Sequence, residues 1–195
     1  MKVFLPVLLS FIVLLSGCAQ KANTQTDKSG LFSVGMADGW VQNSAMAGQK
    51  ENSLRAIFKS AGKNVTVGSI AMEKGSSIFT ITLNAVVFSV SDFDLPVIVD
   101  NILLSSEEGL KKRSATTGDS YNRLSFKTLN LSQFKYAREL VNERTEGGKP
   151  YKEKVVSGVS GNYDVTIVYK ADPAEYDNTL QDADSMIFSF KLVGK

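Results

Sequence analysis

The chain has 195 residues, with 22 lysine and arginine residues against 20 aspartate and glutamate residues, one cysteine and no histidine. Without histidine, Ser-His-Asp and Cys-His catalytic sites and the usual zinc and copper sites are excluded. A single cysteine excludes an internal disulfide and an iron–sulfur cluster. The net charge of +2 gives no indication of nucleic-acid binding. The composition is that of one globular domain, and we expect no metal and no other cofactor.

The N-terminal residues have the pattern of a signal peptide. Lys2 and the amino terminus provide positive charge, and residues 3–15 are almost wholly apolar. A transmembrane helix needs about 20 consecutive apolar residues. This run is shorter than that and has the length of a signal-peptide core.

The apolar run ends at a cysteine that follows two small residues. Residues Leu15, Ser16, Gly17 and Cys18 resemble the lipobox of bacterial lipoproteins. The resemblance implies that a signal peptidase recognises Leu15, Ser16 and Gly17, removes the signal peptide 1–17, and leaves Cys18 acylated with palmitate-type chains in the membrane. Ala19 after the cysteine implies the outer membrane, facing the periplasm. The alternative is a secretory signal followed by an unrelated or buried cysteine.

The mature chain is predicted to begin with a tether and continue into one domain. Residues 19–30 contain no large apolar side chain, so we expect residues 18–30 to form a lipidated cysteine and a flexible linker. Residues 31–195 are numerous enough to bury the core of one domain.

Period-two alternation of apolar residues predicts that the domain consists mainly of β-strands. The clearest strand covers residues 163–170, where Val165, Ile167 and Tyr169 would share the buried face. Glycine-containing turns at 147–150 and 160–162 predict an antiparallel meander in the second half. Further strands are expected in the segments 32–36, 54–59, 65–72, 79–83, 123–131, 134–140 and 151–159.

Two segments have the period of a helix. Leu95, Val99 and Leu103 belong to an apolar stripe that continues to Leu110, and the basic residues 111–113 would suit the helix C-terminus. The second helix is predicted to start at Asp172, followed by a proline. We therefore expect an α+β domain in which helices flank an antiparallel sheet.

Several short motifs resemble the PsbP-like superfamily. They are the aromatic strand 32–36 leading to Gly39-Trp40, the strand 163–167, Tyr176 in the last helix, and the Ile-Phe-Ser-Phe-Lys segment at 187–191. The proline that usually precedes Gly-Trp in that group is missing. The resemblance covers residues 31–195 and implies an α/β/α sandwich with a binding or accessory role and no catalysis.

The leading functional hypothesis is a lipid-anchored cell-envelope protein whose domain binds another envelope protein without catalysis. The first alternative is a carrier of a small ligand in an apolar cleft between the sheet and the 95–110 helix. The second is a hydrolase without histidine, which would need a Ser-Lys dyad or an aspartate pair. We expect Trp40 to cover the core. The acidic residues of the last helix are expected to form a solvated face: Asp172, Glu175, Asp177, Asp182 and Asp184.

Overall fold

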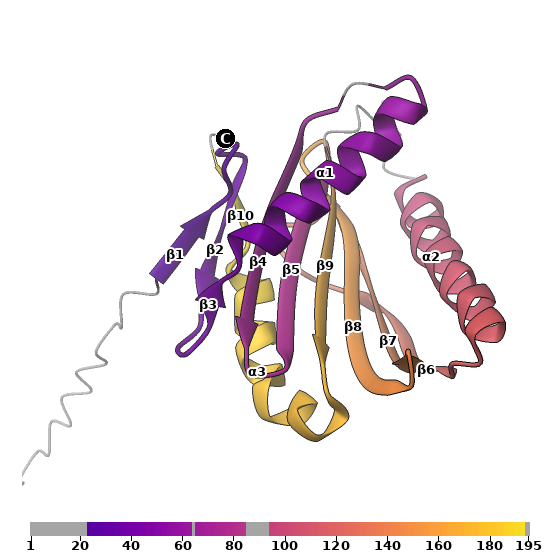
Figure 1. Ribbon diagram of the computed structural model, residues 1–195. Helices are drawn as coiled ribbons and strands as arrows, with labels where there is room; N and C mark the ends of the chain where they lie inside the picture. The colour runs from indigo at the N-terminus through magenta and orange to yellow at the C-terminus, as the bar shows by residue number, and fades with distance from the viewer. Residues whose placement is uncertain (1–22, 64, 85–93, 194–195) are drawn as a thin grey trace, which may run out of the picture.

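The computed structural model describes residues 23–63, 65–84 and 94–193 (Figure 1). The predicted signal peptide, the lipobox and Cys18 lie outside the described residues. Within the described part of the chain, no helix is both long and apolar enough to cross a membrane.

A seven-stranded antiparallel sheet forms the centre of the domain, with the strand order β3-β4-β5-β9-β8-β7-β6 (Figure 1). The predicted meander of the second half is present, because β6 to β9 are consecutive neighbours that pair in antiparallel register. The strands are β3 (Val41–Gln42), β4 (Val67–Lys74), β5 (Ser77–Asn84), β6 (Tyr121–Leu129), β7 (Tyr136–Glu146), β8 (Lys149–Ser160) and β9 (Tyr163–Ala171).

Helices cover both faces of this sheet. On one face, α1 (Ser44–Ser60) packs on β4, and α2 (Leu95–Thr117) packs on β7 and β8. On the opposite face lies α3 (Pro173–Ser189), with a small sheet of β1 (Asn23–Thr26), β2 (Phe32–Met36) and β10 (Lys191–Leu192). Figure 1 shows α1 in front of the large sheet and α3 behind it. The predicted α+β fold with helices flanking an antiparallel sheet is confirmed.

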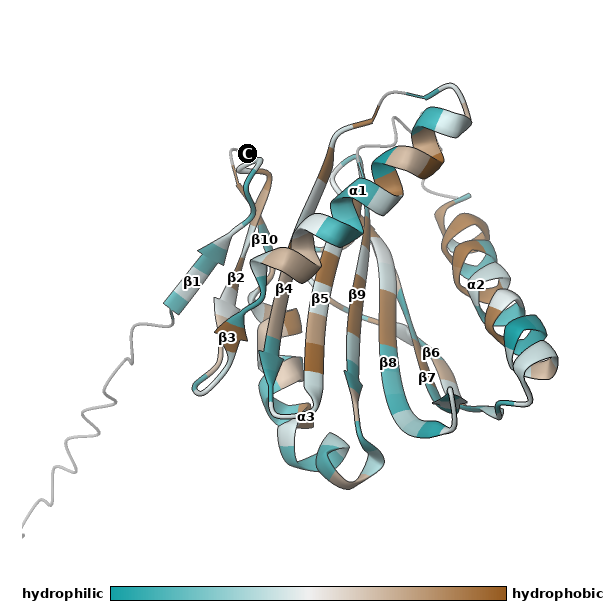
Figure 2. Ribbon diagram, viewed as in Figure 1, coloured by the Kyte–Doolittle hydropathy of each residue, from teal (hydrophilic) through white to brown (hydrophobic). Residues whose placement is uncertain are grey.

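The main hydrophobic core lies between the sheet and α3. Trp40, which is 2% exposed, closes one end of this core, as expected, and its Nε1 donates a hydrogen bond to Asp182 Oδ2 over 3.1 Å. Figure 2 shows hydrophobic residues along β5 and in the first half of α2. The largest fully buried side chains of this core are Phe32, Ile70, Met72, Phe79, Ile81, Leu83, Ile167, Tyr169, Met186 and Phe190.

The prediction of a strand at 54–59 is wrong, because these residues belong to α1. Asn43 starts the helix by accepting a hydrogen bond from the backbone N–H of Met46 over 2.9 Å, which is the usual N-cap arrangement. Ala47 is the only buried residue of α1, so the apolar stripe that reveals a helix in a sequence is almost missing. Phe134 is also misplaced in the prediction: it precedes β7 and stacks on Phe190 at a centroid distance of 5.5 Å.

The ordered domain begins earlier than the predicted boundary at residue 31. Within the predicted linker, β1 pairs with β2 along its whole length. Asp27 follows β1, is 4% exposed, and accepts hydrogen bonds from the backbone N–H groups of Leu31 (2.7 Å) and Phe32 (2.9 Å). A carboxylate held by backbone donors ties this turn to the domain, so the part of the linker from Asn23 onward is folded.

Candidate ligand-binding groove

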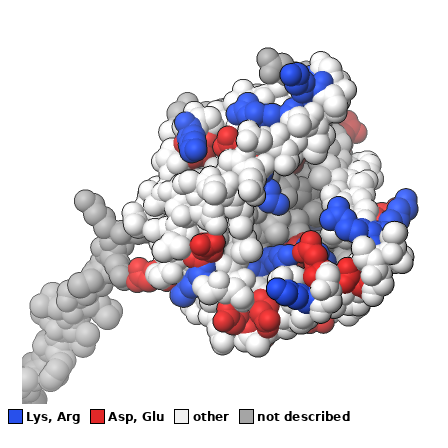
Figure 3. Space-filling model, in the orientation of Figure 1, with Lys and Arg blue, Asp and Glu red and all other residues white. Residues whose placement is uncertain are grey.

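The two faces of the large sheet are covered unequally. In β9, Val165, Ile167 and Tyr169 face α3 and are completely buried. Thr166 and Val168 point to the opposite face and are only half buried. The reason is that α1 lies over β4 and α2 lies over β7 and β8, so neither of these two helices lies directly above β9. Figure 3 shows the surface hollowed between the two helices.

A groove of about 350 Å³ lies between α2 and the sheet. Its apolar lining consists of Leu103 and Leu110 from the helix and Leu140, Val155 and Val168 from three neighbouring strands. These three strand residues are side by side because Leu140 pairs with Val155, which in turn pairs with Val168. The polar lining residues are Ser106, Glu107, Arg113, Glu153 and Thr166.

The N-terminal half of α2 is fixed to the sheet by both apolar and charged contacts. Leu95 and Val99 pack against Val159 of β8. Asp100 forms a two-pronged ion pair with Arg138 of β7, with distances of 2.7 Å to Nε and 3.0 Å to Nη2. A bidentate arginine–carboxylate pair fixes direction as well as distance. These contacts hold the helix that forms one wall of the groove.

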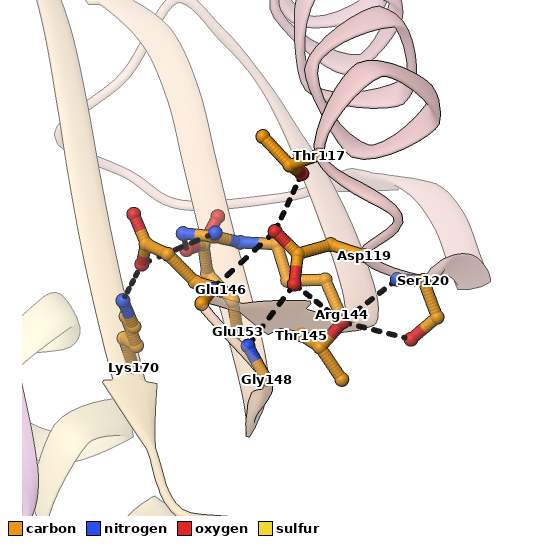
Figure 4. A network of polar contacts seen from close by, with 10 residues as sticks. Thr117, Asp119, Ser120, Arg144, Thr145, Glu146, Gly148, Glu153 and Lys170 are labelled. Carbon is orange, nitrogen blue, oxygen red and sulfur yellow. Dashed lines mark hydrogen bonds and ion pairs between the residues drawn. The ribbon is translucent and has the colours of Figure 1, made fainter.

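The C-terminal end of α2 is joined to the β7–β8 turn through Asp119 (Figure 4). The Asp119 carboxylate accepts hydrogen bonds from the Thr117 hydroxyl (2.6 Å) and from the backbone N–H of Gly148 (3.2 Å). These hydrogen bonds, that of Thr117 first, lower the pKa of Asp119 to about 2. The helix ends at Thr117, so the basic residues 111–113 are not in its last turn as the sequence suggested.

Glu107 is a buried charge on the groove wall. Its residue is 2% exposed, and its Oε1 lies 2.9 Å from Lys111 Nζ and 3.1 Å from Arg123 Nε. Burial, and then the negative charge of Glu107, raise the pKa of Tyr121 above its ordinary value. Two cations therefore neutralise one carboxylate at this position.

Glu153 lies at the same end of the groove and is also neutralised. Its Oε2 is 3.1 Å from Arg144 Nη2, and Arg144 reaches Glu146 over 3.3 Å. Lys170 contacts the same oxygen of Glu146 over 2.6 Å, and this hydrogen bond lowers the pKa of Glu146. Figure 4 shows this chain of charges beside Asp119.

The charge on the lining that lacks a partner is Arg113. Both lining carboxylates, Glu107 and Glu153, are ion-paired, whereas no described residue forms an ion pair with the exposed Arg113 side chain. The groove therefore combines an apolar floor with one available guanidinium group. Sequence reasoning gave a cleft beside the 95–110 helix as an alternative and assigned the basic residues 111–113 to the helix C-terminus. It placed none of Glu107, Arg113 and Glu153 on the lining, because the packing of α2 and the register of β8 decide which residues line the groove.

Buried polar atoms without a hydrogen-bond partner collect on this same face. Asn142 is 0% exposed, and neither its Oδ1 nor its Nδ2 makes a hydrogen bond. It pairs in register with Glu153, which lines the groove. Ser157 Oγ is a second such atom, two positions from Val155. A buried polar atom without a partner is costly, but neither residue lines the groove, so these atoms lie beneath the face and not on its surface.

The acidic residues of α3 are mostly paired one by one, not gathered into a site. Asp172 caps the helix by accepting from the Ala174 N–H (2.9 Å), as predicted. Asp182 pairs with Lys74 (2.9 Å) and Asp184 with Lys154 (2.6 Å). Within the residues that the structure describes, no group of three or more acidic, histidine or cysteine side chains is arranged to hold a metal ion.

The hydrolase hypothesis required an ionisable group with a shifted pKa inside a cleft. Burial raises the pKa of Asp164, against a weaker opposite effect of its hydrogen bond from Asn84. Asp164 is not among the residues lining the groove. Lys154 has its pKa raised by its hydrogen bonds and ion pairs with Asp184 and Glu139, against the opposite effect of burial, which is the opposite of what a lysine base requires.

Comparison with known proteins gives a likeness of fold. No protein-family model and no curated protein sequence matches the chain. Cyanobacterial PsbP (CyanoP) from Synechocystis has a TM-score of 0.53 at 10% identity, with 90% of this chain and 96% of that chain covered. LpqN from Mycobacterium tuberculosis, a protein involved in cell envelope biogenesis, has a TM-score of 0.50 at 11% identity, with 91% and 88% covered.

A third solved structure comes from Bacteroides thetaiotaomicron, with a TM-score of 0.50 at 11% identity. The match covers 88% of this chain but 48% of that one, so the chain spans about half the length of the Bacteroides protein. At such identities the likeness shows the fold alone. The chain thus has a PsbP-like fold, which agrees with the resemblance seen in its sequence motifs.

Proposed function

We propose that this chain is a lipid-anchored cell-envelope protein that binds a ligand in the groove between α2 and the sheet without catalysing a reaction. The groove is the observation that carries the proposal. Its volume of about 350 Å³ lies at the small end of the range of ligand pockets, about 300–1,000 Å³. Its apolar floor and few polar groups have the usual composition of a small-molecule site.

The anchor rests on the sequence at Leu15, Ser16, Gly17 and Cys18. Two or more acyl chains on Cys18 would hold the protein stably at a membrane, and Ala19 favours the outer membrane facing the periplasm. The likeness in fold to LpqN, itself described as involved in cell envelope biogenesis, is consistent with this location. The absence of catalysis is proposed because the chain has no histidine, and its single thiol would be acylated.

The anchor is tested by replacing Cys18 with alanine. We expect Cys18→Ala to abolish incorporation of radioactive palmitate and to leave the chain as an unprocessed precursor. Ser16→Ala keeps a small residue before the cysteine and should be labelled and processed like the wild type. Unchanged palmitate labelling of the Cys18→Ala chain would show that the lipid is not attached at this residue.

Occupancy of the groove is tested by filling it. The full lipidated protein is purified from membranes and analysed by native mass spectrometry for a bound small molecule. Val155→Trp places a large ring on the groove floor and should remove the bound mass. Val97→Trp is the matched control, because Val97 lies on α2 and is 60% exposed outside the groove. A chain that carries no bound mass, or the same mass in both variants, contradicts the proposed site.

A second candidate function is the binding of an envelope protein. The observation that favours it is β6, which is the last strand of the sheet, has nine residues, and pairs on one side only among the described residues. An edge strand can accept a strand from a partner. A photo-reactive amino acid at Leu124 of β6, which is 44% exposed, should then cross-link a partner in cells. The same group at Ile57 of α1 should not.

A further inference from the structure

We infer that the ligand of the groove is a single-chain amphiphile with a carboxylate head, of the size of a ten-carbon fatty acid, with its head at Arg113. This inference rests on the proposed function of the groove and names the class of its ligand.

The floor suits an aliphatic chain. Leu103, Leu110, Leu140, Val155 and Val168 contribute branched aliphatic side chains and no hydrogen-bonding group. Leu110, Val155 and Val168 are partly exposed and can bind an apolar chain through the area that both remove from water. Leu103 and Leu140 are each 2% exposed and lie beneath them. None of the described lining residues is aromatic, so this part of the lining offers no ring to stack on a planar ligand.

The charges select an anionic head. A cationic head would meet Glu107 and Glu153, but these carboxylates are already neutralised by Lys111, Arg123 and Arg144. An anionic head would meet Arg113, whose side chain has no ion-pair partner in the described part of the chain. A guanidinium group matches a carboxylate with two parallel hydrogen bonds, which favours this head over a hydroxyl group.

The dimensions limit the length of the ligand. At about 30 Å³ for each heavy atom, the share that a water molecule has in the liquid, a groove of about 350 Å³ holds about a dozen heavy atoms. Decanoate has this number of heavy atoms. Along α2, the ten steps from Leu103 to Arg113 rise about 15 Å, which is close to the length of an extended decanoate. The chain would lie along the helix with its carboxylate at Arg113.

The experiment uses the full-length protein in isolated cell membranes. A decanoate analogue with a diazirine group on its chain is added and photolysed, and the labelled peptides are identified by mass spectrometry. We expect labels on α2 around Leu103 to Leu110 and on β8 and β9 around Val155 and Val168. Unlabelled decanoate should compete, and decylamine and decanol should each compete at least about tenfold less well, because neither forms the charged pair with arginine.

Three variants distinguish the contribution of the carboxylate head from that of the aliphatic chain to binding. Arg113→Ala should weaken competition by decanoate by about tenfold, the effect of losing a charge-assisted hydrogen bond. Lys112→Ala is the matched control, because it removes the same charge from the neighbouring exposed position and should leave competition unchanged. Val155→Trp should abolish labelling of the groove peptides.

The outcomes separate this inference from the proposed function. Equal competition by decylamine, or equal effects of Arg113→Ala and Lys112→Ala, overturns the carboxylate head. Labels confined to peptides outside the groove overturn the amphiphile as ligand. If native mass spectrometry at the same time shows another molecule that Val155→Trp removes, the groove remains a binding site and a carboxylate amphiphile is not its ligand.

Discussion

The carboxylate of Asp119 accepts a hydrogen bond from the backbone N–H of Gly148, joining the segment after α2 to the turn between β7 and β8. Three further donors contact this carboxylate: the hydroxyl groups of Thr117 and Thr145 and the N–H of Gly147. One aspartate therefore sets where the C-terminal end of the groove wall lies relative to the hairpin that supplies Glu153.

Replacing Asp119 should destabilise the protein in a pH-dependent way. The folded-state pKa of about 2 lies below the ordinary value of 3.8, so the carboxylate stabilises the fold above pH 4 and loses this contribution as the pH falls toward 2. We expect Asp119→Asn to lower the melting temperature at pH 7, and the difference from wild type to shrink as the pH falls. Asp177→Asn, an exposed control, should give little difference. A constant difference between pH 7 and pH 2 would contradict this role.

Glu107→Gln should destabilise the domain by about 2 kcal/mol. Breaking a buried ion pair costs about 3–5 kcal/mol, and the cost is smaller here because the side chains of Lys111 and Arg123 are 49% and 38% exposed. Urea unfolding measures this change. The pKa of Tyr121 should fall, measured by its ultraviolet titration, because Glu107 contributes to raising it.

The matched control for Glu107 is its neighbour. Glu108 forms the same i,i+4 pair with Lys112, but its side chain is 67% exposed. Glu108→Gln should therefore cost no more than about 0.5 kcal/mol and leave the Tyr121 titration unchanged. Similar losses from both variants would show that burial of Glu107 has no energetic consequence.

Asp27→Ala should loosen the N-terminal part of the domain. The variant leaves the backbone N–H groups of Leu31 and Phe32 without the acceptor they have in the wild type, and each unsatisfied buried donor costs about 1–3 kcal/mol. Hydrogen exchange of these two amides should become faster, and urea unfolding should show a loss of about 2 kcal/mol. Lys28→Ala, next to it and exposed, should change neither. Unchanged hydrogen exchange in Asp27→Ala would contradict the role of Asp27 in holding residues 23–30 to the domain.

Two glycine-to-alanine substitutions should change the stability of the domain in opposite directions. At Gly158 of β8, an added Cβ would lie 2.5 Å from the carbonyl oxygen of Tyr136 and 2.7 Å from Phe134 Cδ1, so Gly158→Ala should destabilise by about 1–3 kcal/mol through overpacking. At Gly109 of α2, a Cβ would meet nothing within 4 Å, so Gly109→Ala should stabilise by up to about 1 kcal/mol through helix propensity. Thermal unfolding of both variants measures this, and equal signs would contradict the packing described.

The periodicity of apolar residues in the sequence predicted the helices and strands that bury one apolar face. The stripe of α2, the Asp172 cap of α3 and the alternation in β9 all appear where the sequence places them. The pattern fails at α1, because tertiary contacts bury only Ala47 there and the remaining residues are free to alternate by chance. It also fails at Asp27, whose partners are backbone groups and leave no signal in the identity of neighbouring residues.

The location of the groove could be predicted from the sequence, but the residues that line it could not. A cleft beside the 95–110 helix follows from the expectation that a helix packs on the sheet. That Glu153 and Val155 of β8 face it, together with Leu140 of β7, depends on cross-strand register. Register follows from turn geometry and burial across the whole sheet, and a single strand sequence does not contain it. Arg113 is identified only by the absence of a partner among its neighbours in space.

The three-stranded sheet ties together the two ends of the domain. In it, β2 lies between β1 and β10, with Phe32 opposite Leu192 and Ser33 opposite Lys191. A chain made from its N-terminus onward cannot complete this sheet until its last strand has emerged from the ribosome or the translocation channel. Pairing over such a sequence separation also slows folding. Completion of the fold therefore depends on pairing between the N-terminal and C-terminal parts of the domain. A truncation that removes β10 would leave one edge of β2 unpaired.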